Sequence, residues 1–281
     1  MGEFLRHLWH TRNFVAVIAF AVITLFVATA VFAPLAISWE TATRVTLSEA
    51  LQTPSAAHWL GTDDLGRDLA ARIAWGARVS LVVAVASVAV SLALGVVIGA
   101  LCGYYEGRAS DFVMRCMDFM IAFPRILLAI MLITVMGTGM VSLTAAIGIS
   151  TVPIYARLFR APVLSLKSRE FVLAARSLGA RDAAILFGHI VPNTYSLMII
   201  QGTISLAEAI LIASGLSFLG LGPAPPTPEW GAMIATARAH ITTMPHVVFA
   251  PGIALFLVVL GFNVLGDALR DYIDPKMRQA R

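Results

Sequence analysis

The chain has 281 residues, of which 59% are hydrophobic and 13% are charged, and its formal net charge is +4. A soluble domain does not tolerate so apolar a composition, which indicates an all-α polytopic membrane protein instead. The positive charge is better explained by basic loops that face the cytoplasm than by a nucleic-acid partner, so we expect no nucleic acid.

Apolar segments long enough to cross a membrane recur along the chain. A spanning helix needs roughly 20 apolar residues, because it rises about 1.5 Å per residue and must cross about 30 Å of hydrocarbon. Four segments qualify as single spans: residues 14–37, 79–102, 195–221 and 247–264.

Residues 126–156 carry no formal charge, but they are too many for one span. The sequence MGTGM at 136–140 predicts a turn in their middle. We therefore expect two helices there, and the first must begin near residue 114 to be long enough. The sequence thus predicts six transmembrane helices.

The first apolar run could instead belong to a signal peptide, because Arg6 and Arg12 precede it and Ala-Thr-Ala at 28–30 resembles a cleavage site. Signal peptides have apolar cores of about 7–15 residues, however, and this run is longer. We therefore expect an uncleaved first span.

The orientation follows from lysine and arginine, because basic loops are retained on the cytoplasmic side. With the N-terminus inside, 14 of the 20 basic residues lie in cytoplasmic segments, and the C-terminus is also inside. The expected organisation is a cytoplasmic tail at 1–13, a first span at 14–37, an external segment at 38–78, a five-helix core at 79–266 with a cytoplasmic loop at 157–193 and an external loop at 222–246, and a cytoplasmic tail at 267–281.

The cytoplasmic loop contains a polar segment, residues 170–193, between apolar spans. Ser168 is placed to cap a helix that starts near Glu170, whose carboxylate suits the positive end of the helix dipole. Gly179 is placed to end this helix in a left-handed turn. Because they are spaced by four, Glu170, Ala174 and Leu178 fall on one face.

A second helix is expected from residue 180 or 181 onward, with Ile185 and His189 on it and Pro192 at its end. The small residues in the middle of the first helix would let a groove of another protein approach its backbone closely. An ordinary amphipathic loop between two spans fits the same residues equally well.

The polar segment resembles the EAA loop of type I ABC importer permeases, a motif of glutamate, paired alanines, glycine and then Ile-x-Pro. The residues that match are Glu170, Ala174, Ala175, Gly179, Ile190 and Pro192, with a slightly shifted spacing between Gly179 and Ile190. Residues 61–68, 217–231 and 262–275 are similar to the C-type permease subunits of the dipeptide, oligopeptide and nickel importer family. These blocks follow in order along nearly the whole chain.

The resemblance implies a bacterial inner-membrane permease subunit that imports di- or oligopeptides, with nickel or another small cargo as the alternative. Its partners would be a homologous second permease, two ATP-binding subunits, an external substrate-binding protein and membrane lipid. The residues implied to couple to the ATPase are Glu170, Ala174, Ala175, Leu178, Gly179, Ile190 and Pro192.

The sequence contains no G-x-x-x-x-G-K-[ST] loop that could cradle a nucleotide. We therefore expect a chain that is not an enzyme and binds no cofactor, with ATP and Mg on the partner subunits. Neither Cys102 and Cys116 nor the scattered histidines have metal-ligand spacing, so we expect no metal site and no catalytic residue.

Three charged residues lie within or at the edge of the predicted spans. Glu208 is costly in lipid, so it should face the bundle interior or a watery pathway, where it could contact substrate amines. A structural hydrogen bond to a neighbouring helix is the alternative. Asp118 and Arg125 lie seven residues apart and are expected to snorkel or to pair with other helices.

On the external side, residues 62–68 could form a turn that packs on the partner permease or a landing surface for the binding protein, and we favour packing. The run at 223–228 is proline-rich and stiff, and Trp230 could anchor it at the membrane interface. The residues expected to contact an external partner are Thr62, Asp63, Asp68, Pro228 and Trp230.

Two other functions remain open at this point. A secondary transporter would use an ion gradient, and Glu208 is the feature that could serve it. A membrane anchor without a pathway would leave uptake intact when the polar segment is disrupted.

Overall fold

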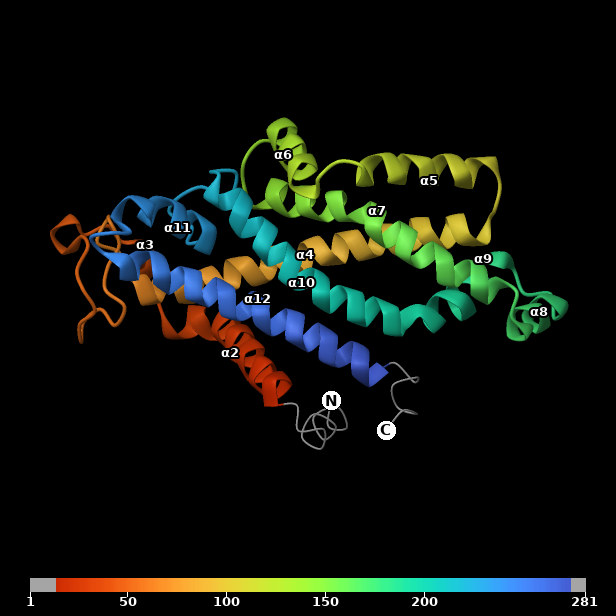
Figure 1. The fold of residues 1–281 in the computed structure, drawn as a ribbon, viewed down its shortest axis with the longest axis horizontal. Coiled ribbons are helices and arrows are strands. Elements are labelled where there is room, and N and C mark those ends of the chain that lie inside the picture. The colour runs from red at the N-terminus through yellow and green to blue at the C-terminus, as the bar shows by residue number, and fades with distance from the viewer. Residues whose placement is uncertain (1–13, 274–281) are drawn as a thin grey trace.

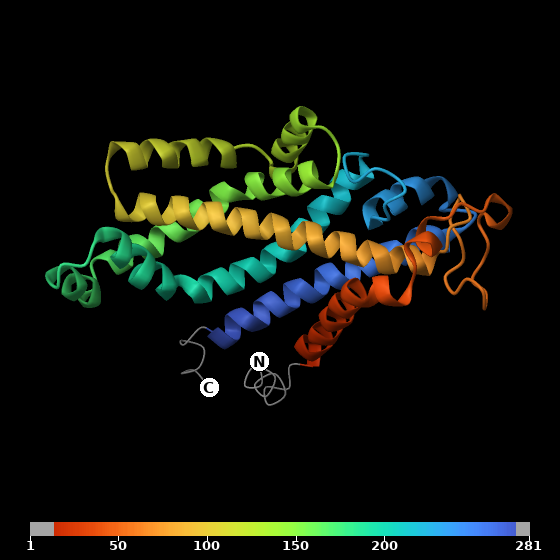
Figure 2. The same cartoon turned by 180° about the vertical axis from the view of Figure 1, so that it is seen from behind.

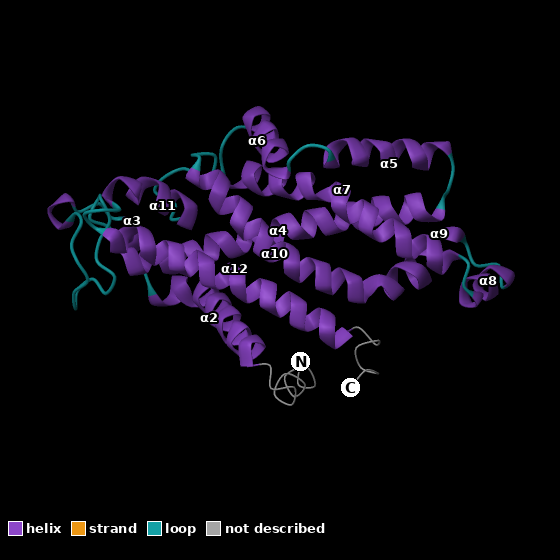
Figure 3. Ribbon diagram, in the orientation of Figure 1, coloured by secondary structure: helices purple, strands orange, loops and turns teal. Residues whose placement is uncertain are grey.

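The computed structural model describes residues 14–273, which form helices without a β-strand. The helices make one elongated bundle (Figure 1), and the loops that join them gather mainly at its ends (Figure 3). The all-α fold is confirmed. The predicted tail at 1–13 and residues 274–281 of the predicted C-terminal tail lie outside the described residues. The long helices are α2 (Phe14–Ala36), α4 (Leu69–Tyr104), α7 (Met140–Lys167), α10 (Tyr195–Phe218) and α12 (Pro245–Ile273).

Short elements lie at both ends of this bundle (Figures 1 and 2). One end holds α3 (Trp39–Thr43), the 3-10 turn η1 (Leu47–Glu49), α11 (Trp230–Ala237) and the 3-10 turn η4 (Arg238–His240). The other end holds α8 (Glu170–Ser177) and α9 (Asp182–Ile185). The start of α2 and the end of α12 point toward the α8 end (Figure 1), as expected for a chain with both termini on the side of the cytoplasmic loop.

The third predicted span is broken. Five helical segments of the described chain are long and apolar enough to cross a membrane, and a sixth crossing requires α5 (Arg108–Ile121) and α6 (Arg125–Met136) together. These two helices meet at an angle of 97°. The break falls at Phe123 and Pro124, because a residue before proline is disfavoured in the α conformation. The single straight helix that we predicted from residue 114 is therefore corrected.

The second span is longer than predicted. Helix α4 starts at Leu69, ten residues before the expected position, because Asp68 accepts a hydrogen bond of 2.7 Å from the backbone N–H of Ala71 and caps the helix. At about 1.5 Å per residue, 36 residues span about 54 Å, well beyond the hydrocarbon thickness of a bilayer. Helix α4 thus connects the two ends of the bundle directly.

Helices α4 and α7 pack closely because three glycines, Gly95, Gly99 and Gly103, lie one turn apart on the shared face. A Cβ atom at Gly95 would collide with the side chain of Tyr155, and one at Gly99 would collide with the backbone of Ala156. Small residues at this spacing let two helix backbones approach in a membrane, where dispersion contacts hold helices together. The α4–α7 pair is therefore the central unit of the bundle.

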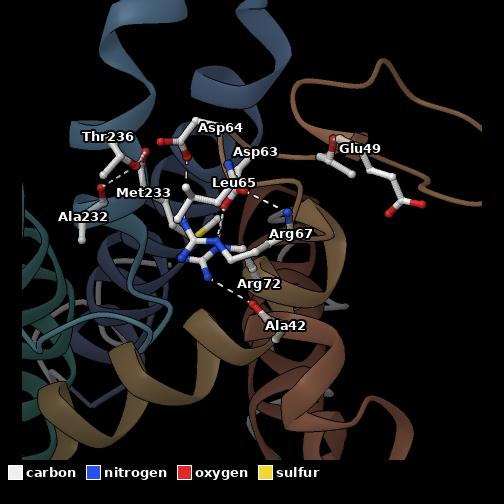
Figure 4. A network of polar contacts seen from close by, with 11 residues as sticks. Ala42, Glu49, Asp63, Asp64, Leu65, Arg67, Arg72, Ala232, Met233 and Thr236 are labelled. Atoms are coloured by element: carbon white, nitrogen blue, oxygen red, sulfur yellow. Dashed lines mark hydrogen bonds and ion pairs between the residues drawn. The ribbon is translucent and has the colours of Figure 1, made fainter. Parts of the chain in front are cut away.

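A buried ion cluster fixes the external segment (Figure 4). Asp63 Oδ1 accepts hydrogen bonds of 3.0 Å from the backbone N–H groups of Leu65 and Arg67, and its Oδ2 accepts one of 2.7 Å from Arg67 Nε. Arg72 Nε lies 3.2 Å from the same Oδ2, and Arg72 Nη1 donates to the carbonyl of Ala42 at 3.1 Å. The cluster ties the loop before α4 to α4 itself and to α3.

Four of the residues that we expected to contact an external partner are buried inside this chain. The Thr62 hydroxyl donates to the Glu49 carbonyl, and Asp63 belongs to the cluster just described. Trp230 donates from Nε1 to the Ile73 carbonyl at 3.1 Å, and Pro228 is buried beside it in sequence. The prediction is corrected for these four, because packing within the chain leaves them no free surface, and Trp230 is no interface anchor. Asp68 is half-buried as the α4 cap, with 16% of its side chain exposed.

Glu229 sits in the same external region and caps α11. Its carboxylate accepts hydrogen bonds from the Ala232 N–H at 2.9 Å and from the Ser214 hydroxyl at 3.0 Å. Burial raises the pKa of Glu229 above its ordinary value, although these hydrogen bonds act in the opposite direction. A carboxyl group whose pKa is raised by folding contributes most to stability at pH values below the pKa that it has in the unfolded chain. This contribution is lost as pH rises through the higher pKa of the folded chain.

Replacing Glu229 with glutamine should therefore flatten the pH dependence of stability. The glutamine side chain would keep an acceptor oxygen for Ala232 but would not ionise. We expect the Tm of the purified protein to fall less in the variant than in the wild type as pH rises from mildly acidic to mildly alkaline. Glu40→Gln, at an exposed position of α3, is the matched control. Parallel curves of Tm against pH for Glu229→Gln and the wild type would contradict the prediction.

Candidate functional site

Helix α8 presents a free face at one end of the bundle. Glu170, Ala174 and Leu178 are all exposed, and Leu178 has 89% of its surface exposed. Beside this face lie the exposed apolar residues Phe171 and Leu173. Exposed apolar side chains gathered on one short helix are typical of a surface that another protein covers.

Helix α8 ends as predicted at Gly179, which has a φ of +80°. The N–H of Gly179 donates to the Arg176 carbonyl at 3.0 Å, and the N–H of Ala180 donates to the Ala175 carbonyl at 3.1 Å. This pair of bonds is a Schellman motif, which glycine favours because the left-handed conformation strains other residues. The predicted cap at the other end is wrong. Arg169 precedes the helix, and the Ser168 hydroxyl donates to the Ser165 carbonyl instead.

The second half of the polar segment does not end at Pro192. Helix α9 continues through a π turn, η2 (Leu186–Ile190), and a 3-10 turn, η3 (Val191–Thr194), directly into α10. Pro192 stands in the first turn of η3, where a backbone N–H has no helical partner to lose. The wider π turn before it leaves room for the change of direction. Consequently the polar segment is joined to α10 without a loop.

A small second core holds the polar segment against the bundle. It joins the end of α4, α7, α8 and the turns before α10, and its centre is fully buried. Its residues are Ala100, Tyr104, Val163, Val172, Ile185, Leu186 and Ile190. Ile190, one of the predicted coupling residues, therefore packs inside the chain, and Ala175 packs at the edge of the same cluster. Of the predicted coupling residues, those on the outer face of α8 stay exposed.

Tyr104, the last residue of α4, connects the two short helices of the polar segment. Its hydroxyl donates to Asp182 Oδ1 at 2.5 Å and accepts from Arg176 Nη2 at 3.1 Å. Lys167 Nζ lies 5.6 Å from the centre of the Tyr104 ring and also donates to Glu106 at 3.0 Å. One side chain on the longest helix thus contacts α8, α9 and the end of α7.

Replacing Tyr104 with phenylalanine should loosen this connection without removing the buried ring. We expect backbone amides of residues 170–185 to exchange with solvent roughly tenfold faster, because two hydrogen bonds to charged groups are lost. Hydrogen-exchange mass spectrometry would measure this, with amides in the middle of α4 as the internal reference. Tyr105→Phe is the control, since Tyr105 is 49% exposed and its hydroxyl has no hydrogen bond among the described residues. Equal exchange in Tyr104→Phe and the wild type would contradict the prediction.

The charged residues of the spans are paired with other helices. Arg125 Nη1 donates to Glu208 Oε2 at 2.9 Å, which joins the start of α6 to the middle of α10. Asp118 of α5 accepts a hydrogen bond from Arg157 of α7. Pairing of Asp118 and Arg125 with other helices was the arrangement expected for them. For Glu208, a hydrogen bond to a neighbouring helix was one of the two roles that we considered, and the structure contains this bond.

Sequence reasoning missed Tyr104, Arg176 and Asp182 as a connected group. No local pattern reveals contacts between residues more than 70 positions apart. The glycines at 95, 99 and 103 could have been found, because a spacing of four in an apolar run is a recognised signal of helix packing. Between residues 14 and 273, no group of three or more His, Cys, Asp or Glu side chains is placed to hold a metal ion.

Comparison with known proteins places this geometry in context. Residues 95–279 match the model of a family described as "Binding-protein-dependent transport system inner membrane component". The chain is 44% identical over 267 residues to a dipeptide transport system permease protein, DppC, of Alkalihalophilus pseudofirmus, an alignment that covers 95% of this chain and 88% of the relative. It is 43% identical over 275 residues to a glutathione transport system permease protein, GsiD, of Pectobacterium atrosepticum, covering 97% and 91% of the two chains. The GsiD protein of Escherichia coli is 41% identical over 276 residues, covering 96% of this chain and 91% of the relative.

Proposed function

Because the chain belongs to the family of binding-protein-dependent transport system inner membrane components, we propose that it forms half of the pathway of an ATP-driven importer of short peptides. It is a multi-pass permease subunit of the inner membrane. The observation that carries the proposal is the exposed α8 face, which a Schellman turn and a second core hold rigidly at the end of the bundle. Such a face can receive force from a soluble partner and pass it to α4, α7 and α10.

The proposed partners are a homologous second permease, two ATP-binding subunits and an external substrate-binding protein. Closure of the ATP-binding subunits would push on α8, and the attached spans would change from inward-facing to outward-facing. ATP and Mg would be bound by those subunits, and this chain would supply no catalytic residue. The exposed face of Glu170, Ala174 and Leu178 is the proposed contact, with Gly179 as the turn that ends it.

The proposed cargo is a di- or oligopeptide. The names of the relatives refer to dipeptide and glutathione transport, and both compounds carry an ammonium group and a carboxylate. Import of nickel or another small cargo by the same architecture is the alternative. Peptide cargo is favoured over it, because the relatives described above are named for dipeptide and glutathione transport.

A secondary transporter would need an intramembrane carboxyl group that is free to exchange protons. Glu208 is the candidate, but its Oε2 already accepts a hydrogen bond of 2.9 Å from Arg125 Nη1. This contact favours a structural link between α6 and α10 over a carboxyl group that is free to exchange protons. The anchor hypothesis offers no reason for the rigid attachment of α8 to three spans.

Reconstitution of the complete complex in liposomes tests the proposal. We expect peptide uptake that requires ATP and the binding protein, and we expect Glu170→Arg or Gly179→Asp to abolish the stimulation of ATP hydrolysis by peptide while insertion stays normal. Uptake without ATP by this chain alone would establish a secondary transporter. Normal uptake by both variants would favour an anchor.

A further inference from the structure

A row of ion pairs runs along α5 and α7 from the α8 end of the bundle toward its middle, where these helices lie side by side (Figures 1 and 2). Arg157, Arg160 and Lys167 share one face of α7, and each pairs with an acidic residue on or just before α5. The pair of Arg125 and Glu208 stands at the inner end of the row. The acidic partners of the row are Glu106, Asp111, Asp118 and Glu208.

The members of this row that lie at membrane depth cannot face lipid. The four acidic side chains keep 43–61% of their surface exposed in the isolated chain. Charged groups exposed to hydrocarbon cost several kcal/mol each, so such residues face a bundle interior or a water-filled cavity. The α5–α7 face therefore lines an aqueous passage or meets the second permease.

The innermost pair retains unused hydrogen-bonding capacity. Arg125 has five N–H donors, and its guanidinium makes one hydrogen bond among the described residues, from Nη1 to Glu208 Oε2. Oε1 of Glu208 accepts no hydrogen bond from the described residues. A carboxylate could therefore bind the free edge of the guanidinium, and an ammonium group could bind Oε1, without separation of the pair.

The surroundings of the pair suit a polar ligand. Arg125 and Glu208 line a cavity of about 10 Å³, which has room for about one water molecule, together with Ser87, Ser91, Thr151 and Ser205. Ligand pockets typically enclose about 300–1,000 Å³, so one chain supplies only one wall of a site that the second permease would complete. The hydroxyls of Ser87, Ser91 and Thr151 bond to helix carbonyls and form a fixed, neutral lining.

We propose that Arg125 and Glu208 bind the two termini of the peptide cargo within the membrane, the carboxylate at Arg125 and the ammonium group at Glu208. The two termini of an extended dipeptide lie at most about 7 Å apart, so both can contact neighbouring side chains. This inference rests on the proposed function and adds the chemical groups that the permease recognises. Peptide charge would be neutralised at the point where the passage leaves bulk water.

Binding to the purified complex, without the binding protein, tests this assignment directly. The probes are alanyl-alanine, its N-acetyl derivative and its C-terminal amide, and the readout is the rise in Tm with probe concentration. For Glu208→Gln and Arg125→Gln, we expect that about tenfold more alanyl-alanine is needed for the same rise. The wild type should bind both derivatives more weakly than alanyl-alanine.

The order in which each variant prefers the three probes distinguishes direct recognition of the peptide termini from a purely structural role of the two residues. Glu208→Gln should lose its preference for alanyl-alanine over the N-acetyl derivative but keep its preference over the amide, and Arg125→Gln should do the reverse. Asp118→Asn, which neutralises one charge of a neighbouring pair, is the matched control. Its Tm should rise with the concentration of each probe as it does in the wild type.

The proposal would be overturned if no probe shifted the wild-type Tm, if the variants titrated like the wild type, or if each variant lost affinity equally for all three probes. Failure of the proposed function gives a different result. In that case the wild-type complex with its binding protein would show no ATP-dependent uptake of alanyl-alanine, whatever the Tm measurements gave.

Discussion

Replacing Leu178 with aspartate is expected to abolish peptide-stimulated ATP hydrolysis and peptide uptake while the fold of the chain is unchanged. Leu178 is 89% exposed and belongs to none of the buried clusters, so the substitution leaves no cavity. If α8 docks in a groove of the ATP-binding subunit, the new carboxylate would be buried there without a partner. Loss of several kcal/mol at one contact corresponds to at least about 100-fold weaker docking.

Two measurements check this expectation. The rate of ATP hydrolysis by the purified complex is compared with and without the peptide-loaded binding protein, and the Tm of the permease is measured in parallel. Leu178→Met, which keeps the volume and apolar character, is the control and should retain stimulation. Full stimulation in Leu178→Asp would remove the α8 face from the coupling contact.

Replacing Gly99 with leucine is expected to have the largest effect on the fold. Even a Cβ atom at this position would overlap the carbonyl of Ala156, so a leucine must push α4 away from α7. Because this pair forms the central unit of the bundle, the displacement would also disturb α10, which packs against both. Overpacking in a core costs about 1–3 kcal/mol, and a collision with backbone cannot be relieved by a change of rotamer.

We expect the Gly99→Leu protein to be recovered largely as aggregate in detergent, and Gly99→Ala to fold with a lowered Tm. Size-exclusion chromatography and thermal unfolding measure the two outcomes. Gly252→Leu is the matched control, because Gly252 lies in the apolar helix α12 and a Cβ atom there would meet no other atom within 4 Å. A monodisperse Gly99→Leu protein with unchanged Tm would show that the close α4–α7 contact does not support the fold.

The long helices could be predicted from the sequence because length and apolar composition alone decide whether a segment can cross a bilayer. The left-handed end of α8 at Gly179 could be predicted too, since the conformation depends on one local residue. The break between α5 and α6 was missed, although Pro124 is present in the sequence. We had placed Asp118 and Arg125 in or at the edge of one span, although charged residues are rare in a span. Their interhelical ion pairs explain why these charges are tolerated.

The external residues were misjudged for a different reason. A conspicuous polar turn such as 61–68 can face a partner or its own chain, and the residue types are the same in both cases. Burial of Asp63 depends on Arg67 and Arg72, which lie close in sequence, but also on Ala42 in α3. The exposed coupling face and the Tyr104 contacts likewise depend on tertiary packing. Local pattern therefore located the polar segment but did not separate its docking residues from its packing residues.

Helix α4 is one continuous rod whose two ends are each held by polar side chains. Its outer end is held by the buried ion cluster of Asp63 and Arg72, and its inner end by the hydroxyl of Tyr104. A rod of about 54 Å converts a tilt of about 5° into a displacement of about 5 Å at its far end. A small rotation at the α8 end would thus move the external mouth of the bundle by nearly one helical turn, with no bending of α4.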